Sequence, residues 1–445
     1  MNTATFSRGV HPHEYKELTS HKPIEKLPAP ESVFIPLQQH IGKPCEPLVA
    51  KGDTVTTGQK IGDAEGLVTA PVHASISGVV KSIGHFPHPL GGRVEMIHIQ
   101  NGSTGASSDS EILLDRPSDW EKASPEELIR VVREAGIVGM GGAGFPAHVK
   151  LNPPPDKPID AFILNGCECE PYLTADHRMM VENTDEILLG MAIICKILGK
   201  CKGYIGIEKN KSDAIQRMQE RVEALHYEFA VVPLEVKYPQ GAEKMLVQSV
   251  LKRKVPAGGL PLDVGVVVHN VGTTLAIHDA IINGKPVTQR VVTVTGDGLR
   301  DPKNILAPVG APFQDLLTYC GETMSETKQV FMGGPMMGLA QYDLSVPLVK
   351  TTSGIVSLHQ EPVGAIRQMP CIQCGNCVSA CPMNLIPTRL ARYTQNQRYT
   401  ELVDWGVFNC IECGSCAFVC PSSIPLVQWI RVGKNKARQG QKSAS

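Results

Sequence analysis

The sequence lacks the features that would direct a chain to nucleic acid, into a membrane or through a secretion pathway. Its 445 residues carry 43 lysines and arginines against 44 aspartates and glutamates, so no basic field exists to hold a polyanion. The longest strongly apolar stretch, residues 187–199, is interrupted by Lys196 and falls short of the roughly 18 to 20 residues that span a bilayer. The first sixteen residues lack the apolar segment of a signal peptide. We therefore expect a globular chain of the cytoplasm that binds no nucleic acid.

A disulfide framework is also lacking. Of the 14 cysteines, eight lie in two blocks near the carboxyl end and the other six are scattered without regular spacing. Disulfide scaffolds need an oxidising compartment and are usually small, whereas a chain of this length with 42% hydrophobic residues can bury several cores. We expect three or four domains, and cysteines that are reduced thiols or metal ligands.

The two cysteine blocks, CIQCGNCVSACP at 371–382 and CIECGSCAFVCP at 410–421, both read C-x2-C-x2-C-x3-C-P. In two-cluster ferredoxins the first three cysteines of such a block bind one [4Fe-4S] cluster and the fourth binds the other. The pattern therefore assigns one cluster to Cys371, Cys374, Cys377 and Cys420, and the second to Cys410, Cys413, Cys416 and Cys381. A pair of zinc sites is the alternative, although zinc motifs usually bring two separated cysteine pairs. Apolar positions at helical spacing over 386–409 predict helices between the blocks.

A glycine-rich segment, GIVGMGGAGFPAHVK at 136–150, follows a helical pattern at 124–135. Its five glycines remove side chains where a flat or phosphorylated ligand could approach the backbone, and Lys150 could meet an anion. The segment lacks the preceding strand of a Rossmann site, so a structural loop is the alternative.

An acidic segment follows at 162–178, FILNGCECEPYLTADHR. A short apolar run ends in Asn165, and Glu168 and Glu170 stand two positions apart. If this stretch is extended, both carboxylates point the same way. A solvated acidic turn is the alternative.

The glycine-rich and acidic segments together resemble the flavin and nicotinamide site of the flavoprotein subunit of respiratory complex I. With GVHPHEYK at 9–16 and the two cysteine blocks, nearly the whole chain resembles the C subunits of the Rnf ion-translocating electron transport complexes. The resemblance implies FMN, NAD(H) and two [4Fe-4S] clusters as cofactors. It also implies a peripheral place on the cytoplasmic side of the cell membrane, with the ferredoxin-like B subunit and integral membrane subunits as partners and ferredoxin as an indirect one.

The same resemblance implies roles for residues around the nucleotides. FMN would lie against the backbone of four glycines: Gly139, Gly141, Gly142 and Gly144. Lys150 would bind near the FMN phosphate or ribityl chain, and Phe145 would stack on the adenine of NAD(H). Three features depart from the complex I pattern: Met140 replaces an arginine, Cys167 replaces an aspartate, and no second phenylalanine follows Lys150.

Further site residues follow from the resemblance. Asn165 and Glu168 would hold the flavin, and Glu170 would lie where the nicotinamide arrives. Glu168 and Glu170 are thus the catalytic candidates, in the sense of positioning, because the flavin supplies the chemistry. The motifs QGAEK and HNVGTT add three residues, with Glu243 near the dinucleotide and Asn270 and Thr273 around the FMN phosphate.

The expected fold class is a multidomain α/β protein. Glycine-punctuated β-branched runs over 48–100 resemble the biotinyl and lipoyl carrier fold, and 101–110 reads as a linker. Strand-like alternation over 286–345, followed by one helix, matches a β-grasp module; Met336 and Met337 are expected in its core. The basic end, 431–442, lacks apolar periodicity and is expected to be a solvated tail, with contact to an acidic partner or the membrane surface as the alternative. The predicted domains are 1–105 (N-terminal segment and barrel-sandwich), 120–285 (FMN and NAD(H) binding), 286–350 (β-grasp, SLBB-like) and 360–445 (two-cluster ferredoxin-like).

The predicted function is electron transfer between NAD(H) and two iron–sulfur clusters through a flavin. Nicotinamide moves electrons in pairs and clusters move them singly, so a flavin converts one to the other. By resemblance, membrane subunits would couple this transfer to Na+ or H+ movement. The alternatives are a soluble NADH diaphorase module of a hydrogenase or other reductase, and a non-enzymatic cluster-binding scaffold.

Overall fold

A sheet of four parallel strands lies in the middle of the chain. The computed structural model describes residues 4–102, 111–199, 201–321, 328–359 and 367–444, and the strand order of this sheet is β11-β10-β9-β12. The strands are β9 (Ala161–Gly166), β10 (Lys202–Glu208), β11 (Phe229–Leu234) and β12 (Val266–Asn270). Asn165 and Asn270 are in register at the ends of adjacent strands. The carboxyl edge of such a sheet is the usual ligand-binding edge of an α/β domain.

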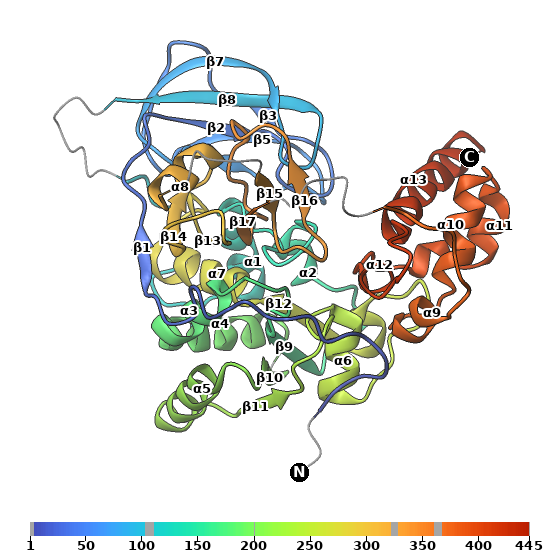
Figure 1. The fold of residues 1–445 in the computed structure, drawn as a ribbon. Coiled ribbons are helices and arrows are strands. Elements are labelled where there is room, and N and C mark those ends of the chain that lie inside the picture. The colour runs from blue at the N-terminus through green and yellow to red at the C-terminus, as the bar shows by residue number, and fades with distance from the viewer. Residues whose placement is uncertain (1–3, 103–110, 200, 322–327, 360–366, 445) are drawn as a thin grey trace.

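Helices cover both faces of this sheet (Figure 1). Phe162 and Leu164 pack toward one helical layer, whereas Ala161 and Ile163 pack toward the other. Because both faces are buried, β9 is an uninterrupted apolar run in the sequence. The first layer contains α1 (Pro125–Glu134), α3 (Ala175–Glu182), α4 (Thr184–Ile197), α5 (Ser212–Ala224) and α7 (Val271–Asn283), and the second contains α6 (Glu243–Leu251).

Helix α1 begins where the sequence pattern predicts. Ser124 accepts a hydrogen bond from the backbone N–H of Glu127 at 3.2 Å, and the Glu127 carboxylate accepts one from the N–H of Ser124 at 2.8 Å. This reciprocal cap, with Pro125 at the first helical position, satisfies N–H groups that the helix itself leaves free. The glycine-rich loop therefore starts from a fixed helix.

The barrel-sandwich consists of two small antiparallel sheets, β2-β8-β7-β4 and β3-β5-β6. Apolar residues of both sheets form one core that includes Val33, Ile61 and Ile97. The strands are β2 (Ser32–Pro36), β3 (Glu46–Pro47), β4 (Thr54–Val55), β5 (Lys60–Asp63), β6 (Val72–His73), β7 (Gly78–Pro87) and β8 (Arg93–Asn101). The predicted linker at 101–110 begins on β8, and its residues 103–110 lie outside the described ranges.

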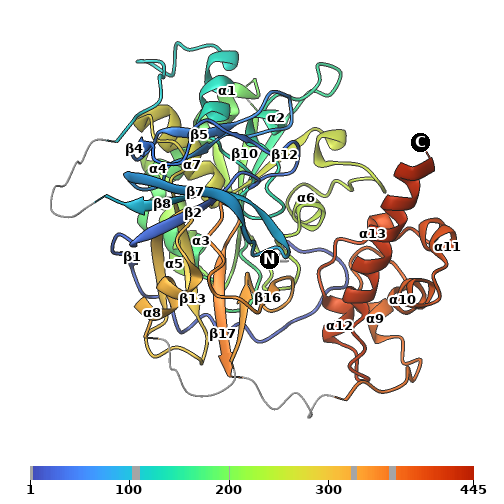
Figure 2. The same cartoon turned by 90° about the horizontal axis from the view of Figure 1, so that it is seen from above.

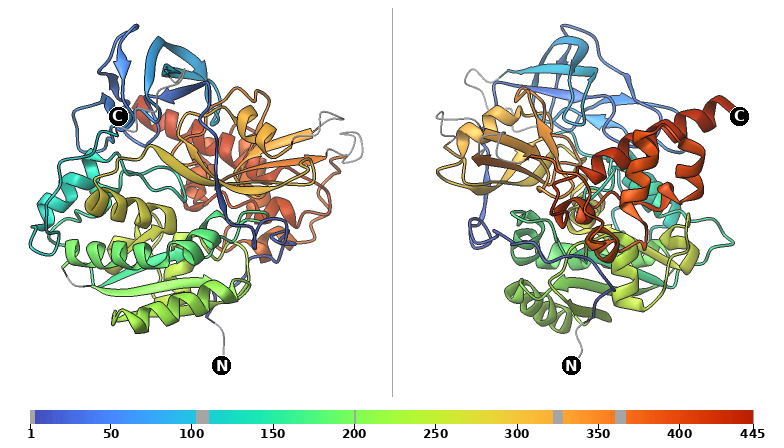
Figure 3. Two further views of the ribbon diagram at one scale, coloured as in Figure 1. Left: turned by 90° about the vertical axis from the view of Figure 1, so that its left-hand side faces the viewer. Right: turned by 45° about the vertical axis from the view of Figure 1, so that its right-hand side comes forward.

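A six-stranded mixed sheet has the order β1-β14-β13-β17-β15-β16. Strand β1 belongs to the N-terminal segment, which runs along the α/β domain and pairs with Leu234 and Tyr238 before joining this sheet (Figure 3). The sheet also extends past the predicted end at residue 350, because β17 pairs with β13 and β15. Its elements are β1 (Ile24–Lys26), β13 (Gln289–Thr295), β14 (Lys303–Pro308), α8 (Phe313–Tyr319), β15 (Lys328–Met332), β16 (Leu339–Gln341) and β17 (Gly354–His359).

The C-terminal domain is helical and lies to one side of the other three (Figure 2). The prediction of helices between the cysteine blocks is confirmed by α10 and α11. The helices are α9 (Asn376–Ala380), α10 (Pro387–Gln395), α11 (Tyr399–Asp404), α12 (Ser415–Phe418) and α13 (Leu426–Ala444).

The prediction of a solvated tail at 431–442 is wrong, because these residues continue helix α13. Ile430, Lys434 and Ala437 follow one helical face and are buried. The Lys434 ammonium donates to Cys410 O at 2.7 Å and pairs with Glu412 at 2.8 Å. A lysine at a buried position interrupts the apolar pattern, which is why the sequence does not reveal the helix.

Candidate functional site

The glycine-rich loop lies between α1 and α2 (Ala147–Lys150), and its glycines serve different purposes. A side chain at Gly141 would crowd Asn270, at 2.8 Å from its Cβ, and one at Gly144 would crowd Thr351 and Gln39. By contrast, a Cβ at Gly142 would meet no described atom within 4 Å, and one at Gly139 would meet only the Phe145 backbone. Gly141 and Gly144 therefore allow close packing, and Gly139 and Gly142 leave the bare backbone that a flat cofactor needs.

The first turn of α7 is hydrogen-bonded to this loop. Met140 donates its backbone N–H to Thr273 Oγ1 at 2.9 Å, and Asn270 caps the helix by accepting from the N–H of Gly272 at 2.9 Å. The Asn270 amide also donates to Asp176 at 2.5 Å. Asn270 and Thr273 thus lie at the carboxyl edge of the sheet, directly beneath the loop.

Asn165 shapes the same edge from the neighbouring strand. Its amide donates to Gly241 O at 2.9 Å, and its oxygen accepts from the N–H of Cys167 at 3.3 Å. The ion pair between Lys150 and Glu243 joins α2 to the start of α6. Phe145, on the loop, is 38% exposed and available for stacking. The structure therefore brings the predicted loop, strand-end and helix residues together.

The expectation that Glu168 and Glu170 point the same way is wrong. Glu168 has a φ of +45°, so the segment is not extended there. The Glu168 carboxylate caps α3 by accepting from the N–H groups of Asp176 at 2.7 Å and His177 at 3.2 Å. The Glu170 carboxylate turns toward a different part of the chain.

Glu170 accepts hydrogen bonds from the backbone of Met336 at 3.1 Å and Met337 at 2.9 Å, and from the Tyr238 hydroxyl at 3.3 Å. Burial raises the pKa of Glu170 to about 7, although these hydrogen bonds oppose the shift. Burial also raises the pKa of Asp176, and the Glu168 carboxylate adds to that shift. Two acids of this site are thus held near the point of protonation at neutral pH.

Lys16 is a site residue that the motif analysis missed. The residue is 7% exposed, and its ammonium donates to the carbonyls of Glu168 at 2.8 Å, Glu170 at 3.0 Å and Leu173 at 2.5 Å. Burial lowers the pKa of Lys16, and the nearby Lys211 lowers it further. Because 152 residues separate Lys16 from Glu168, no local spacing could have revealed this contact.

The eight cysteines of the two blocks line two separate pockets. The inner pocket is lined by Cys381, Cys410, Cys413 and Cys416, and the outer pocket by Cys371, Cys374, Cys377 and Cys420. Each pocket thus combines three cysteines of one block with the fourth cysteine of the other. The outer pocket has a volume of about 240 Å³, and both sets have the donor chemistry of a [4Fe-4S] site.

The inner pocket adjoins the acidic segment of the α/β domain. The Tyr238 hydroxyl donates to Cys413 O at 2.7 Å and also to Glu170. Met336, Cys169 and Tyr238 pack with Cys413 in one apolar cluster. Met336 therefore lies between domains, and Met337 is 43% exposed, so the expectation that both methionines belong to the core is wrong.

The N-terminal segment is also hydrogen-bonded to the helical domain. Arg8 donates to Val378 O at 2.9 Å, and the N–H of Gly9 donates to Ala380 O at 3.2 Å. On the other side, Arg431 donates to Met337 O at 3.1 Å. These bonds hold the inner pocket beside Glu170.

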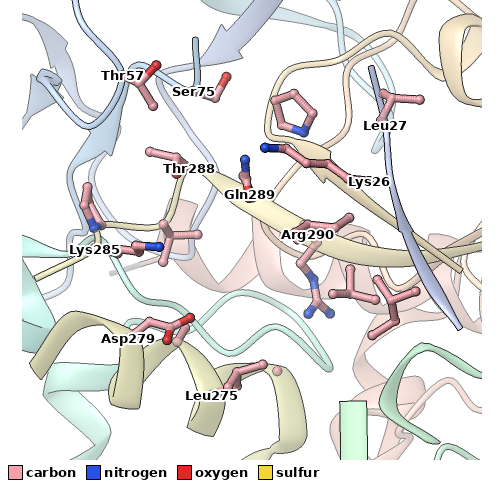
Figure 4. A pocket seen from close by; sticks show the side chains of 18 of the residues that line it. Lys26, Leu27, Thr57, Ser75, Leu275, Asp279, Lys285, Thr288, Gln289 and Arg290 are labelled. Atoms are coloured by element: carbon pink, nitrogen blue, oxygen red, sulfur yellow. The ribbon is translucent and has the colours of Figure 1, made fainter. Parts of the chain in front are cut away.

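A cavity of about 960 Å³ lies elsewhere (Figure 4). The barrel-sandwich, α7 and β13 form its walls, with Thr57, Ser75, Asp279 and Gln289 among the lining residues. It reaches the glycine-rich loop only at Met140 and the start of α7 at Gly272. Within the described ranges, no helix is both long and apolar enough to span a membrane.

Four family models match consecutive parts of the chain. They are the RnfC barrel sandwich hybrid domain at 4–104, the Nuo51 FMN-binding domain at 132–279, the SLBB domain at 291–340 and the 4Fe-4S dicluster domain at 370–424. These matches confirm the predicted fold class and the flavin and iron–sulfur cofactors, and they disfavour zinc in the cysteine blocks.

Solved structures with a similar fold include the NAD+-reducing [NiFe]-hydrogenase in two states. The air-oxidized form aligns with a TM-score of 0.51 at 17% identity, over 73% of this chain and 66% of that chain. The H2-reduced form aligns with a TM-score of 0.53 at 18% identity, over 72% and 64%. At this identity the likeness shows the fold alone.

Relatives of similar length are much closer in sequence. The chain is 48% identical over 435 residues to the C subunit of a proton-translocating ferredoxin:NAD(+) oxidoreductase complex from Clostridium ljungdahlii, covering 98% of this chain and 94% of the relative. It is 43% identical over 432 residues to the C subunit of the Na(+)-translocating complex from Acetobacterium woodii, with 97% of each covered. The chain therefore belongs to the family of C subunits of ion-translocating ferredoxin:NAD(+) oxidoreductase complexes.

Proposed function

We propose that this chain is the NAD(H)-reactive subunit of a ferredoxin:NAD(+) oxidoreductase complex and relays electrons between a flavin site and two iron–sulfur clusters. The observation that carries the proposal is the contact between the inner pocket and the acidic segment, made by Tyr238 through Cys413 and Glu170. Bound FMN would supply hydride exchange with NAD(H) and single-electron exchange with the clusters. The protein supplies position and charge.

We assign the cluster ligands by pocket. Cys381, Cys410, Cys413 and Cys416 would hold the inner cluster, and Cys371, Cys374, Cys377 and Cys420 the outer cluster. The inner pocket packs against Tyr238 and Met336, whereas Cys371 and Cys374 of the outer pocket are exposed. Electrons would therefore pass between the flavin and the inner cluster, and leave or enter the chain at the outer one.

The residues around the flavin site would act by orientation. Gly139 and Gly142 would leave the backbone open to the FMN ring, and Phe145 would stack on the dinucleotide. The ion pair of Lys150 with Glu243 would open or shift as a phosphate or ribityl group approaches. Glu168 would act through the start of α3 that it caps.

Glu170 supports a second part of the proposal. Its carboxylate points toward Met336, Met337 and Tyr238, on the side that faces the inner pocket. Glu170 would thus influence the route from the flavin to the cluster, in addition to the predicted contact with nicotinamide.

We further propose the partners and the location from the family. The relatives are subunits of ion-translocating complexes, so other subunits would receive electrons at the outer pocket and couple the transfer to Na+ or H+ movement. Ile372, beside two exposed cysteines, is 67% exposed and suits a protein contact. The ferredoxin-like B subunit and the membrane subunits are the expected partners, on the cytoplasmic side of the membrane, with ferredoxin acting through them.

A soluble diaphorase module, the alternative that the sequence leaves open, is the second candidate, because the fold likeness to the NAD+-reducing hydrogenase does not distinguish the two. The flavin site would be the same in both cases. Affinity purification of the tagged chain from its native membranes separates them, because only the first candidate predicts retention of integral membrane subunits after detergent extraction.

An anaerobic spectrum with iron and flavin analysis tests the core of the proposal. We expect about eight iron atoms and one FMN per chain, with flavin absorbance that bleaches on addition of NADH. Purified protein that binds clusters but neither FMN nor NADH would instead support the scaffold alternative.

A further inference from the structure

Arg290 is a buried cation that forms no ion pair with any residue the structure describes. It lies on β13 and is 3% exposed, with its side chain directed toward α7 (Figure 4). Its Nη2 donates to Met140 O at 3.1 Å, and its Nε has no hydrogen-bond partner among the described residues. Within the same residues it forms no ion pair. A guanidinium offers five N–H donors, so most of its capacity is unused here.

Burial makes an unpaired guanidinium costly. Burial lowers the pKa of Arg290, while Asp176 and Glu168 oppose the shift from a distance. Both carboxylates are engaged elsewhere, because Glu168 caps α3 and Asp176 accepts from Asn270. A buried charge normally has a hydrogen-bonded partner of opposite sign, so a further anion is expected at this point.

The start of α7 is the place to which Arg290 reaches. A Cβ at Gly272 would overlap Arg290 Nη1, so the absence of a side chain there lets the guanidinium approach the first helical turn. Helix α7 is 13 residues long, and the N-terminus of such a helix attracts anions through its free N–H groups and its dipole. Met140, Gly272 and Arg290 also line the same end of the large cavity.

We propose that Arg290 is an additional ligand of the phosphate monoester of the flavin cofactor, beside Asn270 and Thr273, which are already expected around that phosphate at the start of α7. This inference rests on the proposed function, which places FMN on the glycine-rich loop. A guanidinium donates two parallel, charge-assisted hydrogen bonds to phosphate, and so adds a full positive charge to the neutral N–H groups of the helix terminus. Because Arg290 also holds the carbonyl of Met140, it would connect the phosphate to the loop beneath the flavin.

The test compares FMN with riboflavin, which lacks the phosphate. Full-length protein is depleted of flavin anaerobically, and the Kd for each flavin is measured by fluorescence quenching for the wild type and for Arg290→Gln. We expect FMN affinity to fall by about ten- to hundredfold, the range for hydrogen bonds to charged groups, while riboflavin affinity is retained. Arg290→Lys, which keeps the charge but not the paired donors, should show an intermediate loss and serves if Arg290→Gln does not fold.

Arg178→Gln is the matched control. Arg178 lies on α3 and is satisfied by Glu182 at 2.8 Å, so its loss should leave the ratio of the two affinities unchanged. Equal losses of FMN and riboflavin affinity in the Arg290 variants would assign Arg290 a structural role and overturn the inference. A wild-type chain that binds neither flavin would instead overturn the proposed function itself.

Discussion

The inner and outer pockets share one cysteine motif and have opposite surroundings. Gly414 and Gly375 follow the second cysteine of each block and have nearly the same φ, +78° and +80°. A side chain at Gly414 would overlap the carbonyl of Met336, whereas one at Gly375 would meet no described atom within 4 Å. Tyr238 donates to Cys413 of the inner pocket, and the corresponding Cys374 of the outer pocket is exposed.

In the proposed relay, the packing around each cysteine loop, and not the shared motif, therefore sets which pocket lies near the flavin site. Hydrogen bonds also reach sulfurs of the inner pocket, from the N–H of Leu385 to Cys381 and from that of Glu412 to Cys410, both at 3.4 Å. Cluster potentials depend on such bonds and on solvent exposure, so we expect the two clusters to differ in potential despite identical ligand spacing.

The largest expected effect comes from removing one cysteine of each pocket. Cys413→Ala should lose the inner cluster, about four of roughly eight iron atoms per chain, and NADH should then no longer reduce the outer cluster. Cys374→Ala should lose the same amount of iron but leave NADH reduction of the flavin and of the inner cluster intact. EPR spectra after NADH addition measure both outcomes. Reduction of the outer cluster in Cys413→Ala would show that the order of the relay is reversed or branched.

The paired glycines test the packing difference directly. Gly375→Ala should cost only the strain of a positive φ, about 1 kcal/mol, whereas Gly414→Ala adds an overlap with Met336 worth about 1–3 kcal/mol. The contact between the helical domain and the segment around Met336 should therefore be less stable in Gly414→Ala. Thermal unfolding and limited proteolysis measure the effect. Equal destabilisation in the two variants would mean that the contact with Met336 contributes nothing.

Spacing and composition were sufficient to predict the parts of the site that lie within short segments. The helix beginning near residue 124, the glycine-rich loop and the crossed cysteine sets are local patterns, and the structure has the helix, the open loop and the two four-cysteine pockets at these places. The register of Asn165 with Asn270 comes from the structure, because the sequence patterns do not show which strands pair.

Contacts between distant segments could not be predicted in this way. Lys16, Tyr238 and Met336 reach the acidic segment from three separate parts of the chain, and none stands in a motif that signals its partner. The turn at Glu168 depends on the helix start that its carboxylate caps, so alternation in the sequence misled the prediction for Glu170. The helix over 431–442 was missed because its buried face contains Lys434.

The stability of the folded chain should depend on pH through Glu170, which lies beside the inner pocket. Its pKa is raised to about 7 in the folded chain against 4.5 for the ordinary group, so the folded state binds more protons between these values. The contribution of Glu170 to the free energy of unfolding is then greatest below about pH 4.5 and is lost as pH rises toward about 7. Glu170→Gln should remove this loss, stabilising the chain by about 1–3 kcal/mol more at pH 8 than at pH 5.

Thermal unfolding at the two pH values measures the Glu170 effect. Glu243→Gln is the control, because Glu243 pairs with Lys150 at a half-exposed position. A Glu170→Gln chain that gains the same stability at both pH values would show that the carboxyl does not titrate in this range.

The smallest expected effect comes from removing the Tyr238 hydroxyl, which links the inner pocket to the acidic segment. Tyr238→Phe keeps the buried ring, which is 1% exposed, and removes the hydrogen bonds to Cys413 O and Glu170. The free energy of unfolding should fall by about 1 kcal/mol, the usual net value of a hydrogen bond. Tyr342→Phe, at an 86% exposed position, should change nothing.

Rapid mixing with NADH gives the second measurement on Tyr238→Phe. Flavin reduction should keep its wild-type rate, because the hydroxyl does not touch the glycine-rich loop, and reduction of the inner cluster should slow. In the proposed relay the outer pocket receives electrons only after the inner one, so its reduction should slow by the same factor. If reduction of the outer cluster slows while the rate of inner-cluster reduction is unchanged, Tyr238 lies outside the electron path. Its hydrogen bonds would then contribute only to the packing of the inner pocket.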